Sequence, residues 1–179
     1  MVERVMERGR EPEPKELAYE QTMKWNAEQR RKRLEGKVVV RGQDNPFEQN
    51  RMGLVKFYSY PQVWDSLAAP DWMIAIHSVR RHSGKHCHQG GLILFILEGK
   101  GYSVVDGVRY DWEEGDCIIL PVKPEGCEHQ HFNANPDPEQ PGTFIAFIFY
   151  PMKNAMGNVL EQRADSPDWQ GPPTRYHGA

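Results

Sequence analysis

The stretch HCHQGGLILFILEG, residues 86–99, decides the fold. It places two histidines, one residue apart, ahead of an apolar run that has the length of a β-strand. In a strand, residues two positions apart project from the same face, so His86 and His88 can direct both imidazoles into one cavity. The stretch therefore predicts a strand that carries two inward histidines, followed by a buried strand.

Around this stretch, residues 54–150 consist of short strand-like runs separated by turn residues. The runs are rich in β-branched and aromatic residues. Asp106-Gly107, between two of them, predicts a tight hairpin because both residues tolerate positive φ. Since no helical segment separates the runs, the pattern predicts an all-β fold, a single antiparallel β-barrel. The expected strands are Leu54–Ser59, Trp72–Val79, Leu92–Leu97, Tyr102–Val105, Val108–Trp112, Cys117–Leu120, Glu128–Asn133 and Thr143–Tyr150.

The segments that flank the barrel differ from it in composition. Residues 1–53 are expected to form a helical arm, with a helix over Pro14–Leu34 that packs on the barrel or on a second subunit. Residues 151–179 are expected to form a short C-terminal tail, with a helix over Gly157–Arg163 and extended chain after it. The expected organisation is therefore an arm at 1–53, a barrel at 54–150 and a tail at 151–179.

The bulk composition excludes several classes of protein. The chain has 179 residues, enough for one domain, and a formal net charge of −3, too small for a nucleic-acid binder. The basic run Arg30–Arg33 is interpreted as the solvated end of a helix, where cations suit the macrodipole. No apolar run has the length of a membrane span, and the charged N-terminus does not resemble a signal peptide. We expect no membrane association and a cytoplasmic location.

Five of the seven histidines lie between His82 and His131, and a second pair, His129 and His131, repeats the spacing of His86 and His88. Neutral imidazole is a common ligand of divalent metals, so two such pairs on adjacent strands could converge on one ion. Imidazole accepts iron, zinc, manganese and nickel, and the sequence does not choose among them. His131 could be a fourth ligand, a proton relay, a partner of a ligand, or a structural residue.

Other polar residues near the pairs allow more than one interpretation. Gln89 and Glu128 flank the histidines and could orient an imidazole through its free N–H. Arg109 and Tyr102 could reach the cavity or lie on the surface. His77 and His82 are interpreted as structural.

These residues resemble the two motifs of the cupin family. His86-Cys87-His88 is followed at the family's distance by Gly99, and Pro124-Glu125-Gly126-Cys127-Glu128-His129, closed by Asn133, is similar to the second motif. The resemblance covers Trp72–Tyr150. It implies a jelly-roll barrel and one divalent metal ion held by His86, His88 and His129. The chain departs from the motif where the family usually has a glutamate ligand, because Leu92 stands there.

A three-histidine set without the glutamate resembles the gentisate and salicylate dioxygenase branch of cupins. The resemblance implies an Fe(II) dioxygenase that cleaves a C–C bond in a small oxygenated aromatic or diketone substrate, with His131 and Gln89 as candidate catalytic residues. That branch binds a ring carboxylate through an arginine, whose place Leu94 takes here, and usually has two barrels. Cupins also commonly pair through their sheets, which implies a homodimer.

Two other functions remain open at this point. One is a non-redox isomerase, decarboxylase or lyase that uses zinc, manganese or nickel as a Lewis acid. The other is a cupin that binds a small molecule without turnover. A barrel alone does not distinguish them, because function depends on the site.

Overall fold

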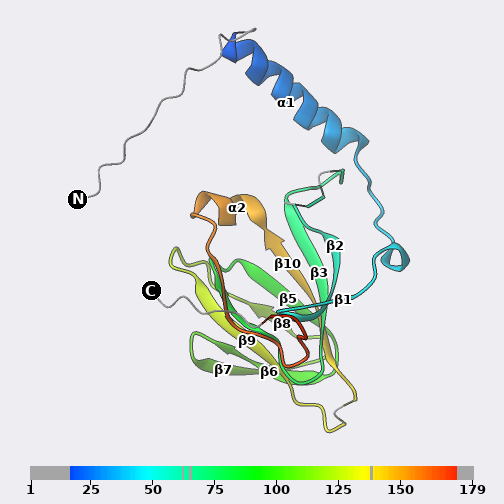
Figure 1. Cartoon of the computed structure of the whole chain (residues 1–179), viewed down its shortest axis with the longest axis vertical. Helices are drawn as coiled ribbons and strands as arrows, with labels where there is room; N and C mark the ends of the chain where they lie inside the picture. The colour runs from blue at the N-terminus through cyan, green and yellow to red at the C-terminus, as the bar shows by residue number, and fades with distance from the viewer. Residues whose placement is uncertain (1–16, 62, 65, 138, 173–179) are drawn as a thin grey trace, which may run out of the picture.

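Two antiparallel β-sheets face each other and enclose one core (Figure 1). The computed structural model describes residues 17–61, 63–64, 66–137 and 139–172. One sheet has the strand order β1-β2-β3-β10-β5-β8 and the other has the order β11-β4-β9-β6-β7. The elements are α1 (Ala18–Glu35), η1 (Gly42–Asp44), β1 (Glu48–Asn50), β2 (Gly53–Ser59), β3 (Trp72–Val79), β4 (Lys85–His88), β5 (Leu92–Glu98), β6 (Lys100–Val105), β7 (Val108–Glu113), β8 (Cys117–Ile119), β9 (Cys127–Asn133), β10 (Gly142–Phe149), α2 (Tyr150–Ala155) and β11 (Leu160–Ala164).

The predicted all-β fold with an N-terminal helix is confirmed, and each of the eight expected strands is present within a few residues. Strand β5 is buried on one face only, although residues 92–97 are all apolar. Leu92, Leu94 and Ile96 are each at most 4% exposed, whereas the residues between them are about two-fifths exposed. This alternation is the period of two that a strand imposes, and it aims one face of β5 at the core.

The hairpin at Asp106-Gly107 forms as expected. Asp106 has φ of 49° and Gly107 has φ of 83°, so both turn residues adopt the left-handed region. Val105 and Val108 pair across the turn and set the register of β6 against β7.

The C-terminal tail differs from its prediction. The expected helix over Gly157–Arg163 is wrong, because β11 occupies most of this range and pairs antiparallel with β4. The helix of this region, α2, comes earlier and ends before Gly157, which has φ of 100°. The composition of the tail did not reveal β11, because an open strand edge on β4 supplies its backbone hydrogen bonds.

Of the two packing partners expected for the N-terminal helix, the structure excludes the barrel, and a second subunit stays a prediction. Helix α1 begins at Ala18 and buries none of its residues, so it does not pack along the barrel; it lies apart from the two sheets in Figure 1. An ion pair between Arg33 and Asp71 joins its last turn to the barrel. Pro14, the expected start of the helix, lies outside the described residues. The structure describes no helix that is long and apolar enough to cross a membrane.

Candidate metal centre

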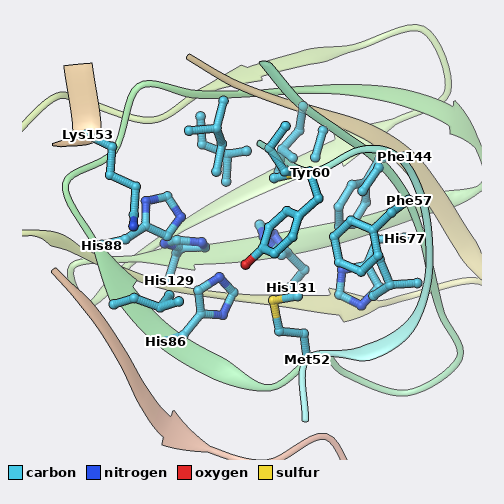
Figure 2. Close-up of a pocket in the computed structure, with 18 of the residues that line it drawn as sticks. Met52, Phe57, Tyr60, His77, His86, His88, His129, His131, Phe144 and Lys153 are labelled. Atoms are coloured by element: carbon cyan, nitrogen blue, oxygen red, sulfur yellow. The ribbon is translucent and has the colours of Figure 1, made fainter. Parts of the chain in front are cut away.

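Strands β4 and β9 bring three histidines together inside the barrel. They pair so that His86 lies opposite His129, and strand parity points His88 into the same cavity. All three side chains are at most 7% exposed. The ring of His129 lies 4.3 Å from that of His86 and 4.8 Å from that of His88, centre to centre. One possible donor atom of each residue lies within 4.8 Å of the other two, so the cluster could hold one metal ion (Figure 2).

Hydrogen bonds fix the tautomer of His129. Its Nδ1 lies 3.0 Å from the carbonyl oxygen of Cys127, which can only accept, so Nδ1 carries the hydrogen. The lone pair of a neutral imidazole is then on Nε2, which is buried and has no hydrogen-bond partner among the described residues. A buried, unpartnered lone pair that faces two other imidazoles fits a metal ligand. The hydrogen of His86 is placed on Nδ1 in the same way, because this nitrogen lies 3.4 Å from the carbonyl oxygen of Gly84.

In His88 the other ring nitrogen carries the hydrogen. The backbone N–H of Gly90 donates to its Nδ1 over 3.2 Å, which places the hydrogen of the neutral ring on Nε2. To present a lone pair from Nε2, this ring must move its hydrogen to Nδ1 and give up the bond from Gly90. Metal binding through Nε2 of His88 would therefore be coupled to the loop 89–91.

His131 shares the face of His129 but stands outside the cluster of three. Its ring centre is 5.5 Å from that of His129. Trp112 Nε1 donates to Ser103 Oγ over 3.0 Å, and Ser103 Oγ lies 2.7 Å from Nδ1 of His131. One lone pair of the Ser103 hydroxyl accepts the indole N–H, and Nδ1 of His131 is the acceptor that the described residues offer to the hydroxyl hydrogen. With this hydrogen directed to Nδ1, the imidazole hydrogen is on Nε2. This tautomer makes His131 a hydrogen-bond donor beside the cluster.

Burial keeps the histidines that line the cavity uncharged. Loss of solvent lowers the pKa of His77 and His86 to about 4 and that of His88 to about 3. The pKa values of His129 and His131 are also lowered well below the usual range, first by burial and then by neighbouring histidines. At neutral pH the rings therefore keep the lone pairs that a metal requires.

A cavity of about 100 Å³ opens onto these histidines. Its remaining walls are apolar or aromatic except for His77 and Lys153. The described lining residues are Met52, Val55, Phe57, Tyr60, Met73, Ala75, His77, His86, His88, Leu92, Leu94, His129, His131, Phe144, Ala146, Ile148, Tyr150, Lys153 and Leu160. In Figure 2 the hydroxyl of Tyr60 points toward the histidines and Lys153 lies beside His88. Sequence reasoning missed these two residues, because one precedes a loop and the other lies in the tail.

The other candidates lie elsewhere. Gln89 is 1% exposed but does not line the cavity; its Nε2 donates to the carbonyl oxygen of Met156 over 3.2 Å. Glu128 forms an ion pair with Lys85 on the opposite face of the sheet from His129.

Arg109 and Tyr102 are not among the residues that line the cavity. They pack against each other, with the guanidinium of Arg109 3.8 Å from the ring centre of Tyr102. His77, interpreted from the sequence as structural, lines the cavity, and its buried Nε2 has no hydrogen-bond partner among the described residues. His82 contacts Gln130 and Phe132 outside it.

Parts of the chain are similar to known proteins. Residues 74–146 match the family model of the cupin domain. A salicylate 1,2-dioxygenase from Pseudoaminobacter salicylatoxidans is 15% identical, with a TM-score of 0.50, over 78% of this chain and 36% of its own. A predicted oxalate decarboxylase from Thermotoga maritima is 21% identical, with a TM-score of 0.47, over 63% of this chain and 99% of its own.

These likenesses are of the fold alone, and this chain spans about a third of the length of the dioxygenase that it matches. No curated protein matches the chain. The family match covers the strands that carry the inward histidines. Residues 74–146 are similar to the cupin domain, and they include a buried cluster of three histidines that could hold a metal ion.

Proposed function

We propose that this protein is an Fe(II)-dependent dioxygenase that cleaves a C–C bond in a small oxygenated aromatic or diketone substrate. The observation that carries the proposal is the cluster of three histidines without a carboxylate. Leu92, at the position where a fourth, acidic ligand is usual in the resembling family, is buried in the core and lines the cavity as an apolar side chain.

The donor set fits such a metal. Three neutral imidazoles leave the full positive charge of a divalent ion and leave coordination positions free, which suits a substrate with two adjacent oxygens together with dioxygen. When bound, the iron would supply the redox chemistry and the Lewis acidity. The apolar walls around it would exclude competing water.

The residues of the chain would divide the remaining tasks. The Nε2–H of His131 would donate a hydrogen bond to an oxygen that gains negative charge during the reaction. The hydroxyl of Tyr60 is a second donor on the same cavity. Gln89 would act through the loop that also holds His88, because its side chain joins this loop to Met156 after α2.

Oxygen consumption by the iron-loaded protein tests the proposal. The substrates are a catechol, gentisate and a β-diketone, each assayed with the metal content measured in parallel. We expect consumption with at least one substrate, about one iron per chain, and loss of both in His129→Ala. His82→Ala is the matched control, because His82 is a histidine of the same barrel outside the cluster, and it should keep both.

Other outcomes favour the other functions. Turnover under nitrogen with zinc, manganese or nickel would indicate the non-redox enzyme. Tight binding of a small molecule without any product would indicate the binding protein. Iron-loaded protein that consumes no oxygen with any substrate would contradict the dioxygenase.

A further inference from the structure

One cation stands among the described residues that line the cavity. Lys153 is 5% exposed and lies on α2, and no aspartate or glutamate lines the cavity with it. None of the ion pairs formed by the described residues includes Lys153. A buried ammonium group without a negative partner is costly, so its place in this wall calls for a compensating group.

The hydrogen bonds of Lys153 are also incomplete. An ammonium group has three hydrogens to donate, and one is directed to Oδ1 of Asn158 over 3.0 Å. Nζ also lies 5.1 Å from the ring centre of Tyr150, a contact that favours the cation without accepting a conventional hydrogen bond. Donor capacity therefore remains at the wall where Lys153 lies beside His88 (Figure 2).

The charge on the described walls of the cavity is positive, because Lys153 lies there and no aspartate or glutamate does. The histidines are neutral, and a divalent metal bound to them would add positive charge beside Lys153. An anionic oxygen group would restore both the hydrogen bonds and the charge balance, and the apolar walls would accept only a small hydrocarbon body.

We propose that Lys153 sets the specificity of the site by binding the negatively charged oxygen group of a small, otherwise apolar ligand, while an adjacent oxygen of the ligand reaches the histidine cluster. The inference rests on the proposed function for the presence of a metal, and it adds the charge class of the substrate and the residue that selects it. The ligand is a monoanion whose charge is shared between oxygens, as in a carboxylate or an enolate.

Binding of two matched probes to zinc-loaded protein tests the inference without any oxygen chemistry. Salicylate carries a carboxylate, and salicylamide is a neutral molecule of nearly the same shape. Calorimetry gives the ratio of their Kd values for the wild type and for Lys153→Met, Lys153→Gln and Lys153→Arg. Lys100→Met, which removes an exposed lysine of β6, is the control.

We expect the preference for salicylate to fall roughly tenfold or more in Lys153→Met and Lys153→Gln, the range of a lost charge-assisted hydrogen bond. It should change less than about threefold in Lys153→Arg and Lys100→Met. The ratio isolates Lys153, because zinc itself also favours the charged probe. Both neutral variants should fold, since they remove an unpaired buried charge.

A preference that is unchanged in both neutral variants would overturn the inference, and so would an equal loss of affinity for both probes, because Lys153 would then only shape the cavity. The two proposals can fail separately. If the preference for salicylate depends on Lys153 but the iron-loaded protein consumes no oxygen, the inference about Lys153 holds and the dioxygenase is contradicted. If Lys153→Met still consumes oxygen and its preference for salicylate is unchanged, the dioxygenase holds and the inference about Lys153 is contradicted.

Discussion

The hydroxyl of Ser103 lies 2.7 Å from Nδ1 of His131, on the wall of the cavity next to the histidine cluster. Ser103 is fully buried and also accepts the indole N–H of Trp112. The three side chains form a chain of hydrogen bonds that ends at the imidazole and determines which of its nitrogens carries the hydrogen.

Removing this serine hydroxyl should release His131 and destabilise the fold. In Ser103→Ala the indole N–H of Trp112 loses its acceptor in the core, at a cost of about 1–3 kcal/mol in the free energy of unfolding. Nitrogen-15 NMR of the metal-free protein should show His131 protonated on Nε2 in the wild type and a mixture of tautomers in the variant. Protonation on Nδ1 in the wild type would contradict the assignment.

The metal-free protein should lose stability in mild acid. The buried histidines have pKa values lowered to about 4 or less, whereas the unfolded chain binds protons below pH of about 6.5. In the window between these values the unfolded state binds more protons, so the free energy of unfolding should fall as pH falls, by up to about 1.4 kcal/mol per pH unit for each such histidine.

Urea titrations at several pH values between 7.5 and 4.5 would measure this slope. His77→Leu removes one buried histidine that is not among the three clustered residues, so it should reduce the slope by roughly the share of one group. A wild-type stability that does not change over this range would show that the histidines titrate normally in the folded state.

Gly90 holds the loop that carries His88. Gly90 has φ of 83°, and an added Cβ would lie 1.7 Å from the carbonyl oxygen of Pro121. Gly107 has the same φ, and an added Cβ there would meet no atom within 4 Å. Left-handed strain should therefore lower the free energy of unfolding of both alanine variants by about 1–2 kcal/mol. Only Gly90→Ala should be destabilised further, by a steric clash.

Thermal unfolding and zinc titration would compare the two variants. We expect Gly90→Ala to unfold at a lower temperature than Gly107→Ala and to bind zinc more weakly, because displacement of the loop moves His88. Equal zinc affinity in the two variants would show that the loop does not position this ligand.

The homodimer remains a prediction, and the outer face of the six-stranded sheet is the surface on which to test it. Ile93, Phe95 and Leu97 on β5 are about two-fifths exposed, and Ile119 on β8 is 73% exposed. Apolar side chains grouped in this way favour contact with another surface. Light scattering should give twice the monomer mass for the wild type and the monomer mass for Phe95→Glu. A monomeric wild type would contradict the prediction.

Most of the barrel could be predicted, because its strands are short runs rich in β-branched and aromatic residues that turn residues separate. The strand-length apolar run of β5 and the turn at Asp106-Gly107 are local patterns, and the structure has a strand and a hairpin at these places. The meeting of His86, His88 and His129 was also predictable, since the family motif and the strand period agree on which side they face.

The rest of the site depends on contacts that no local pattern encodes. Lys153 belongs to a segment that the sequence presents as a tail, and it reaches the cavity only because α2 follows β10 directly. The tautomer of His131 depends on Ser103 and Trp112, which lie 28 and 19 residues from it along the chain. Strand β11 escaped prediction because its partner β4, and not its own composition, makes it extended.

The pairing of β11 with β4 determines when the histidine cluster becomes enclosed. The strand that bears the first histidine pair lies between β9 and β11, and Leu160 of β11 stands opposite His88 and lines the cavity. During synthesis, both histidine pairs are present in the chain before the segment that closes this edge emerges. Until β11 docks, the backbone of β4 has one free side, and the centre stays open to solvent there. Completion of the centre is therefore a late, C-terminal event, and a chain cut before Leu160 would keep every proposed ligand but lose the enclosure around them.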